Sequence, residues 1–184
     1  MTPSYALEEL QRETTFGGAG SETKRDVPVI DLSNFEERRE QIADELWHAA
    51  TEIGFFQLKN HGIARSEIDA AFKESDRFFK LPNDVKSQWP RPKGVNAGYE
   101  TRSQIRPSTG TADEKESYQI TQYHMDGLWP TEGELPNFQD NILSFEQQCW
   151  EVGMKVLSCF ADKLGFERDF FTKTHDPKQS DYQS

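Results

Sequence analysis

The sequence is poor in positive charge and in long apolar runs. Its 21 lysines and arginines face 32 aspartates and glutamates, which gives a net charge of -11 over 184 residues. Nucleic acids and anionic membrane surfaces bind proteins through a basic footprint, so we expect neither as a partner. No apolar run approaches the roughly 20 residues that span a bilayer. The first 26 residues lack the apolar stretch of a secretory signal and predict a polar, flexible arm.

Cysteine is also scarce, and only Cys149 and Cys159 are present. Both fall in one helical pattern, which separates them by about 15 Å along a helix. Because a disulfide needs Cα atoms within roughly 7 Å, the two thiols are not expected to pair with each other. A reducing, cytoplasmic compartment is the simplest interpretation.

Residues 27–184 are predicted to form one α+β domain with three main helices and a few short strands. Residues 26–32 predict a strand, and the spacing of Ser33 and Glu36 is that of a capping box, which begins a helix. One face of this first helix is apolar and contains Phe35, Ile42, Leu46, Ala49 and Ile53. Gly54 is a residue type that ends helices, and residues 55–58 then predict a short buried strand.

The second half of the sequence alternates helices with irregular segments. A second helix is predicted from a cap at Ser66, and a helical turn over 82–86. Residues 90–110 predict a long loop with one strand pair around Tyr99, and residues 116–120 alternate like a strand. A third helix is expected over 138–164, followed by a short one near 167–171. The core-facing residues predicted for the second and third helices are Ile68, Phe72, Ser75 and Phe79, and Ile142, Phe145, Cys149, Val152, Val156 and Phe160.

Several phrases occur in a recognisable order between residue 27 and about residue 170. They are VPVIDLS (27–33), IGFFQLKNHGI (53–63), RFFKLPNDVK (77–86), Gly98 with Tyr99, KESYQI (115–120), and the set Trp129, Pro130, Pro136 and Phe138. In this order they resemble the amino-terminal region of the isopenicillin N synthase-like 2-oxoglutarate/Fe(II)-dependent dioxygenases. One phrase alone is a weak signal, whereas the ordered set is specific.

This resemblance implies oxidation by Fe(II) and O₂, usually with 2-oxoglutarate as the electron donor. In that family a His-x-Asp and a distant His hold the metal, and an Arg-x-Ser pattern binds 2-oxoglutarate. These parts belong to a double-stranded β-helix, or jelly roll, that follows the region matched here, and QSDYQS (179–184) is similar to its lead-in. The resemblance therefore implies a truncated or fragmentary chain whose barrel core is largely absent and which binds no iron or 2-oxoglutarate alone.

Tyr99 and Arg102 are the candidate substrate-binding residues. The loop around them carries one acid, Glu100, against five basic residues, namely Lys86, Arg91, Lys93, Arg102 and Arg106. Such a local excess of positive charge could face an anionic substrate such as a carboxylate. The alternative is an exposed loop with solvated charges. The resemblance places this loop near the mouth of the active site.

A second candidate is a metal site made of His124, Asp126 and His175. Residues i and i+2 of an extended segment point the same way, so His124 and Asp126 could share one metal. The resembling family has no ligands at this place, and no arginine follows His175. We therefore favour loop residues over ligands here. We likewise favour a structural role for His61, with a backbone hydrogen bond, over a role in catalysis.

Three functions follow from these patterns. The first is the amino-terminal scaffold and substrate-entrance domain of a non-haem Fe(II)/2-oxoglutarate-dependent oxygenase, inactive without the catalytic barrel as its partner. The second is a stand-alone interaction module derived from that family. The third is a small metalloprotein that uses the histidines and aspartate named above. Under the first, the apolar helix faces over 35–53 and 138–164 lack a sheet to pack on, which predicts self-association or partial unfolding, whereas the second predicts a monodisperse chain.

Overall fold

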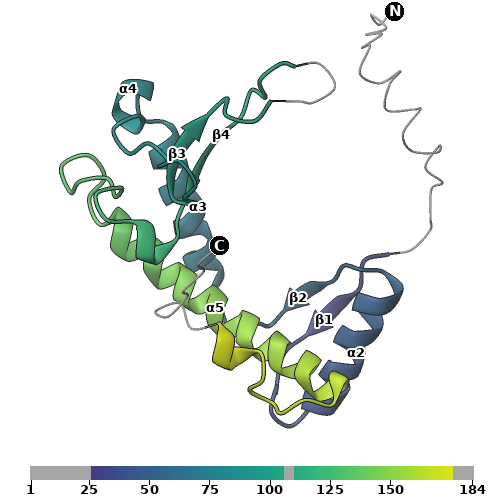
Figure 1. The fold of residues 1–184 in the computed structure, drawn as a ribbon. Coiled ribbons are helices and arrows are strands. Elements are labelled where there is room, and N and C mark those ends of the chain that lie inside the picture. The colour runs from purple at the N-terminus through teal and green to yellow at the C-terminus, as the bar shows by residue number, and fades with distance from the viewer. Residues whose placement is uncertain (1–25, 106–109, 176–184) are drawn as a thin grey trace, which may run out of the picture.

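The computed structural model describes residues 26–105 and 110–175, so most of the predicted arm lies outside the described residues. Figure 1 shows an open, curved arrangement in which one long helix, α5, connects two groups of elements. In chain order the elements are β1 (Val29–Asp31), α2 (Arg39–Glu52), β2 (Gln57–Lys59), α3 (Arg65–Phe79), α4 (Asn83–Lys86), β3 (Gly98–Thr101), β4 (Glu116–Gln119), the 3-10 turn η1 (Gln122–His124), α5 (Phe138–Leu164) and the 3-10 turn η2 (Thr172–Thr174).

The strands of the described residues form two separate pairs. β1 and β2 run parallel, with Val29 opposite Gln57 and Ile30 opposite Leu58. β3 and β4 are antiparallel, with Tyr99 opposite Tyr118. The α+β class and the three main helices are confirmed, and no closed barrel is present within residues 26–105 and 110–175.

Each end of α5 takes part in a separate hydrophobic core. The aliphatic core lies between β1, α2 and the second half of α5, and its buried members are Ile30, Leu32, Ile42, Ala43, Leu46, Ala49 and Cys159. The aromatic core lies between α3, the β3–β4 hairpin and the start of α5, and its buried members are Phe78, Trp89, Ala97, Tyr99, Met125, Leu128, Leu135 and Phe138. The packing of α5 against both α2 and α3 holds the two cores in one structure.

The predicted face of the first helix is confirmed, because Ile42, Leu46 and Ala49 are completely buried. The expectation that this face lacks a packing partner is therefore wrong, since β1 and α5 cover it. The predicted helix ends at Gly54 and Gly165 are also confirmed. Gly54 has φ +86° and donates to the carbonyl of Ala49, and Gly165 has φ +75° at the end of α5.

Both predicted caps are wrong. The chain forms turns over 33–38, because the Ser33 amide donates to Asp31 Oδ1 at 2.9 Å and Arg38 Nη1 donates to the Ser33 carbonyl at 3.0 Å. Helix α2 therefore begins at Arg39. Helix α3 begins at Arg65, so Ser66 lies inside it instead of capping it.

The predicted inner face of the second helix is wrong as well. Phe72 is 71% exposed, whereas Glu74 and Phe78 are buried. The Glu74 carboxylate accepts hydrogen bonds from Arg77 Nη1 at 2.6 Å and from Asn141 Nδ2 at 3.0 Å, which ties α3 to α5. The buried face of α3 therefore includes a carboxylate that is paired by hydrogen bonds, and it is not the purely apolar stripe.

Two shorter elements also differ from expectation. Phe55 is 72% exposed, and the strand begins two residues later, at Gln57. The short helix predicted near 167–171 is a turn followed by η2. No described helix has the length and apolar character required to cross a bilayer.

Candidate functional site

Tyr99 lies in β3 and is part of the aromatic core, with only 4% of its surface exposed. Its backbone passes close to the segment before it, because the Tyr99 amide donates to the Trp89 carbonyl at 2.7 Å. The preceding residue, Gly98, has φ +92°, and a Cβ there would stand 3.0 Å from the Trp89 carbonyl oxygen. Only glycine fits this close approach, so the position of the hairpin depends on it.

A polar network that joins the buried Lys86 to the more exposed Glu116 holds the Tyr99 ring. The Tyr99 hydroxyl donates to Glu116 Oε2 at 2.6 Å, and Lys86 Nζ donates to the same oxygen at 2.5 Å. Lys86 also donates to the Phe79 carbonyl at 3.1 Å, and its ammonium lies 5.4 Å from the centre of the Tyr99 ring. The Lys86 side chain is only 3% exposed. Its buried charge is compensated by the Phe79 carbonyl of α3, the Tyr99 ring of β3 and the Glu116 carboxylate of β4.

The network shifts the acidities of two of its members. The hydrogen bond from Lys86, and then that from Tyr99, lowers the pKa of Glu116 below its ordinary value. Burial, together with the Glu116 carboxylate, raises the pKa of Tyr99. At neutral pH Glu116 is therefore a carboxylate and Tyr99 a protonated phenol. This arrangement fixes the hairpin on α4.

Arg102 lies at the exposed end of the same hairpin. Its φ is +52°, a left-handed conformation that is uncommon for a residue with a side chain. Its amide donates to the Lys115 carbonyl at 2.9 Å, and its guanidinium binds Glu114 Oε2 at 2.7 Å. Arg102 lines a polar hollow of about 490 Å³, whose other lining residues are Asn83, Thr101, Glu114, Lys115 and Glu116.

The positive excess predicted for this loop is compensated by acids. Besides the pair of Lys86 with Glu116, Arg91 binds Glu100 at 2.8 Å and Arg102 binds Glu114. Sequence reasoning missed Glu114 and Glu116 because it counted charges only up to Arg106, which itself lies outside the described residues. The antiparallel register of β3 and β4 places Glu116 opposite Thr101, and the pairing continues from Arg102 to Lys115, beside Glu114. The sequence predicted a strand pair around Tyr99 but not its register, and without the register the positions of Glu114 and Glu116 could not be predicted.

The proposed metal set is not assembled. No group of three His, Cys, Asp or Glu side chains that could hold a metal ion exists among residues 26–105 and 110–175, a range that includes His124, Asp126 and His175. His124 ends the exposed turn η1. His175 Nδ1 instead lies 2.6 Å from the Phe171 carbonyl, and its own carbonyl accepts a hydrogen bond from Trp150. The described structure therefore does not bring His124, Asp126 and His175 together as a metal site.

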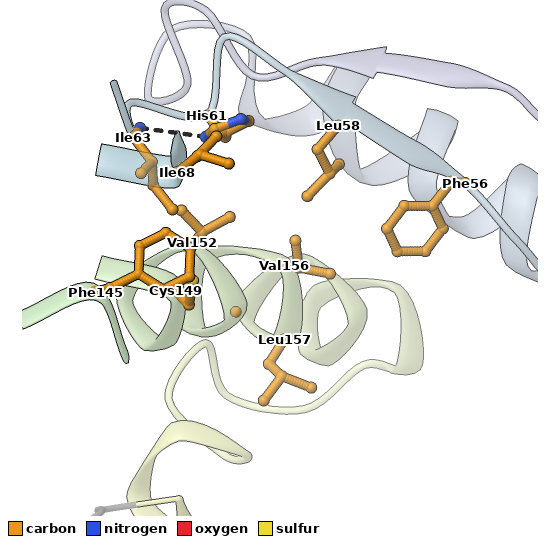
Figure 2. Close-up of a pocket in the computed structure, with 11 residues that line it drawn as sticks. Phe56, Leu58, His61, Ile63, Ile68, Phe145, Cys149, Val152, Val156 and Leu157 are labelled. Atoms are coloured by element: carbon orange, nitrogen blue, oxygen red, sulfur yellow. Dashed lines mark hydrogen bonds between the residues drawn. The ribbon is translucent and has the colours of Figure 1, made fainter. Parts of the chain in front are cut away.

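His61 has the structural role that we favoured. Its Nδ1 accepts a hydrogen bond from the Ile63 amide at 3.2 Å, which closes the turn after β2. Figure 2 shows this ring at one end of an apolar groove between β2 and α5. The groove has a volume of about 600 Å³. Its lining residues are Phe56, Leu58, His61, Ile63, Ile68, Phe145, Cys149, Val152, Gly153, Val156 and Leu157.

Comparison with known proteins assigns the family. A family model described as "non-haem dioxygenase in morphine synthesis N-terminal" matches residues 27–137. The chain belongs to this non-haem dioxygenase N-terminal family. Its relatives include 2-oxoglutarate/Fe(II) oxygenases, which confirms the resemblance noted in the sequence.

Three relatives illustrate the extent of the similarity. A UPF0676 protein of Schizosaccharomyces pombe is 34% identical over 163 residues, covering 84% of this chain and 49% of the relative. The 1-aminocyclopropane-1-carboxylate oxidase of Dictyostelium discoideum is 27% identical, covering 82% and 46%. A full-length Neurospora crassa protein, solved in complex with alpha-KG, has a TM-score of 0.70 at 28% identity, covering 84% and 52%. This non-haem dioxygenase N-terminal chain thus spans about half the length of these relatives.

Proposed function

We propose that this chain is the N-terminal scaffold and substrate-entrance domain of a non-haem Fe(II)/2-oxoglutarate-dependent oxygenase. The observation that carries the proposal is the family match over residues 27–137, in a chain that spans about half of each relative. The described residues provide no ligand set for iron, so the groups that bind iron and 2-oxoglutarate are expected in the other half of such an enzyme. Two free thiols, Cys149 and Cys159, support a cytoplasmic location.

The β3–β4 hairpin is the part of this domain that we assign to the substrate entrance. Arg102 lies on its exposed end, beside the polar hollow, and its partner Glu114 is mostly exposed. An exposed ion pair is weak, so an anionic substrate group could replace Glu114 on the guanidinium. The hydroxyl of Tyr99 is already bound to Glu116, so we assign Tyr99 the role of holding the hairpin beneath Arg102.

Anaerobic titration with Co(II), followed by visible absorption, tests this proposal. The chain alone is expected to show no 1:1 metal binding and no conversion of 2-oxoglutarate to succinate. A His124→Ala variant should give the same result as the unmodified chain. Stoichiometric binding by the chain that is lost in His124→Ala would contradict the scaffold proposal.

A stand-alone interaction module is the second candidate, and the apolar groove between β2 and α5 favours it. Sedimentation velocity and thermal unfolding distinguish the scaffold domain from the stand-alone module. A groove that normally faces a covalently attached barrel predicts self-association or partial unfolding of the isolated chain. A monomer that unfolds sharply at every concentration would favour the module.

A further inference from the structure

Arg102 has a backbone conformation that distinguishes it from the other described residues. Apart from glycines, the described residues with positive φ are Asn34, Asn60, Arg102 and Asn137. Asparagine adopts the left-handed region because its short side chain hydrogen-bonds locally, whereas the long arginine side chain is strained there. A strained backbone persists only where the surrounding structure maintains it, and such residues cluster at binding and active sites. The strain at Arg102 therefore indicates a binding role for this residue.

The strained residue lines the polar hollow at the end of the β3–β4 hairpin. Successive residues of a regular strand point to opposite faces. β3 ends at Thr101, however, and both Thr101 and the left-handed Arg102 line the hollow, together with Glu116 from the opposite strand. The Arg102 amide still donates to the Lys115 carbonyl at 2.9 Å, which fixes the residue in place. The hairpin thus presents a guanidinium to a concave surface of about 490 Å³.

The two acids of the hollow differ in how firmly they are held. Glu116 Oε2 accepts hydrogen bonds from Lys86 at 2.5 Å and from Tyr99 at 2.6 Å, so this carboxylate is fixed. Glu114 Oε2 accepts from Arg102 Nε at 3.0 Å and from its Nη2 at 2.7 Å. The Glu114 and Arg102 side chains are 75% and 63% exposed, and an ion pair in water contributes little to stability. Arg102 and Glu114 are therefore the two charges that a ligand can separate.

A ligand that binds the guanidinium releases the Glu114 carboxylate, and that charge needs a new partner. A simple anion would lie beside the released carboxylate, in a chain whose net charge of -11 already repels anions. A ligand with both a carboxylate and an ammonium group satisfies the two released charges and replaces one ion pair with two. From this charge balance we infer that the hollow binds a free amino acid as a zwitterion, with its carboxylate on Arg102 and its ammonium on Glu114. The inference rests on the proposed function and names the substrate class of the entrance.

The other lining residues define the side chain of this amino acid. Asn83 and Thr101 contribute neutral hydrogen-bonding groups, Lys115 contributes a second cation, and none of the six lining residues is apolar. Small-molecule sites usually occupy about 300 to 1,000 Å³, so this hollow has room for a side chain as well as the two charged groups. An apolar side chain would leave the lining groups unpaired, whereas a carboxamide hydrogen-bonds to them. The ligand is therefore an amino acid with a polar side chain, and glutamine is the probe.

Two analogues of glutamine test the two halves of the charge balance on the complete chain. Glutaramate lacks the ammonium group of glutamine, and 4-aminobutanamide lacks its α-carboxylate. Titrations are followed by the NMR signals of the Arg102 Nε–H group and the Glu114 amide, with the Arg65 Nε–H group on α3 as an internal control. Glutamine is expected to shift the first two signals to saturation, and each analogue to bind at least tenfold more weakly. Leucine, whose side chain is apolar, should bind at least threefold more weakly than glutamine.

Substitution of each partner should remove one discrimination and keep the other. In Glu114→Gln the ammonium group has lost its partner, so glutaramate should bind within twofold of glutamine. In Arg102→Gln the carboxylate has lost its partner, so 4-aminobutanamide should bind within twofold of glutamine. The matched change Arg65→Gln breaks another exposed pair, with Asp69, and should leave all three affinities within twofold of those of the unmodified chain. Each comparison is between ligands on one protein, so partial loss of folding does not produce these ratios.

Several results would overturn the inference. If glutaramate binds the unmodified chain as tightly as glutamine does, the hollow is a simple anion site. If 4-aminobutanamide does so, it is a simple cation site. The absence of a saturable shift at millimolar glutamine excludes a site of either kind, and equal binding of leucine overturns the assignment of a polar side chain.

The Co(II) titration of the same chain separates this inference from the proposed function. A chain that binds neither Co(II) nor glutamine overturns the zwitterion site and leaves the scaffold function intact. Glutamine binding as expected, together with stoichiometric Co(II) binding that is lost in His124→Ala, supports the zwitterion site and contradicts the scaffold function. If the chain binds Co(II) in this way and does not bind glutamine, both proposals fail.

Discussion

The aromatic and aliphatic cores at the two ends of α5 are enclosed to different degrees. In the aromatic core, Phe78 contacts the rings of Trp89, Tyr99, Tyr118 and Phe138, with centroids 4.3 to 6.1 Å apart. Large rings fill this volume from several directions. The aliphatic core contains isoleucine, leucine and alanine side chains that α2 covers on one side, whereas the groove leaves it open beside β2.

This difference indicates which of the two cores is enclosed by the described residues alone. The aromatic end closes around its own hairpin and neutralises its buried Lys86 internally. The aliphatic end has a two-stranded sheet and a helix face that extends beyond it. We therefore expect the aromatic end to depend on its own contacts and the aliphatic end to gain stability from an added layer.

The largest loss of stability is expected from Phe78→Ala, which removes the ring at the centre of the aromatic core. The change should lower the free energy of unfolding by about 4 kcal/mol, through lost burial and a cavity. Urea denaturation followed by tryptophan fluorescence measures it. Phe72→Ala, in the same helix but 71% exposed, should stay within about 0.5 kcal/mol of the unmodified chain. Equal losses in the two variants would mean that Phe78 is not the centre of a closed core.

The next effect tests the aliphatic core. Leu46→Ala removes a fully buried side chain between β1 and α5 and should lower the free energy of unfolding by about 3 kcal/mol. Amide exchange measured residue by residue shows how far the damage spreads. We expect α2 and β1 to lose protection before α3 does. Uniform loss over the chain would show that the two cores unfold as one unit.

A smaller effect is expected when cysteine is replaced by serine in α5, once in its covered part and once in its open part. Cys159→Ser buries a hydroxyl in apolar surroundings and should lower the free energy of unfolding by about 1 to 2 kcal/mol. Cys149→Ser, in the groove, should change it by less than about 0.5 kcal/mol. Thermal unfolding of the two variants side by side measures the difference. A large effect at Cys149 would indicate that the groove is closed in solution.

The smallest effect concerns the polar support of the aromatic core and depends on pH. The folded-state pKa of Glu116 is lowered from 4.5, so its stabilisation is present above that value and is lost as the pH falls through the folded pKa. Glu116→Gln should lower stability at pH 7 by about 1 kcal/mol, a modest value because the side chain is 35% exposed and partly screened. The difference between the two proteins should shrink below pH 4.5. Urea titrations at pH 7 and pH 3.5 provide the comparison, and a gap that does not narrow would exclude the ion pair as its source.

Local sequence patterns predicted much of the fold. The apolar spacing of Ile42, Leu46 and Ala49 and the glycines at 54 and 165 indicated helix faces and ends correctly, because these features act within one or two turns. The face of α3 could not be predicted in this way. Its orientation depends on the hydrogen bond between Glu74 and Asn141, which are far apart in the sequence.

At the candidate site, too, local patterns were predicted correctly and contacts between distant residues were not. The sequence indicated the family and a strand pair around Tyr99, and both are confirmed. It did not indicate that Lys86 would be buried against Glu116, since that contact depends on how α4 packs against β4. Substrate binding by Arg102 stays a prediction, whereas the hydroxyl of Tyr99, the second predicted substrate-binding residue, is bound to Glu116. The groove was missed because nothing local in the sequence shows that β2 is the last strand of its sheet.

The length of α5 has a consequence for which sequence changes the molecule tolerates. Its 27 residues make a rod of about 40 Å that meets α3 near Asn141 and α2 near Cys159. Inserting one residue between these points would rotate one half against the other by about 100° and shift it by about 1.5 Å. Neither end could then keep its partner without breaking the helix. Insertions and deletions should therefore be excluded from the middle of α5, while the connecting loops of the domain accept them.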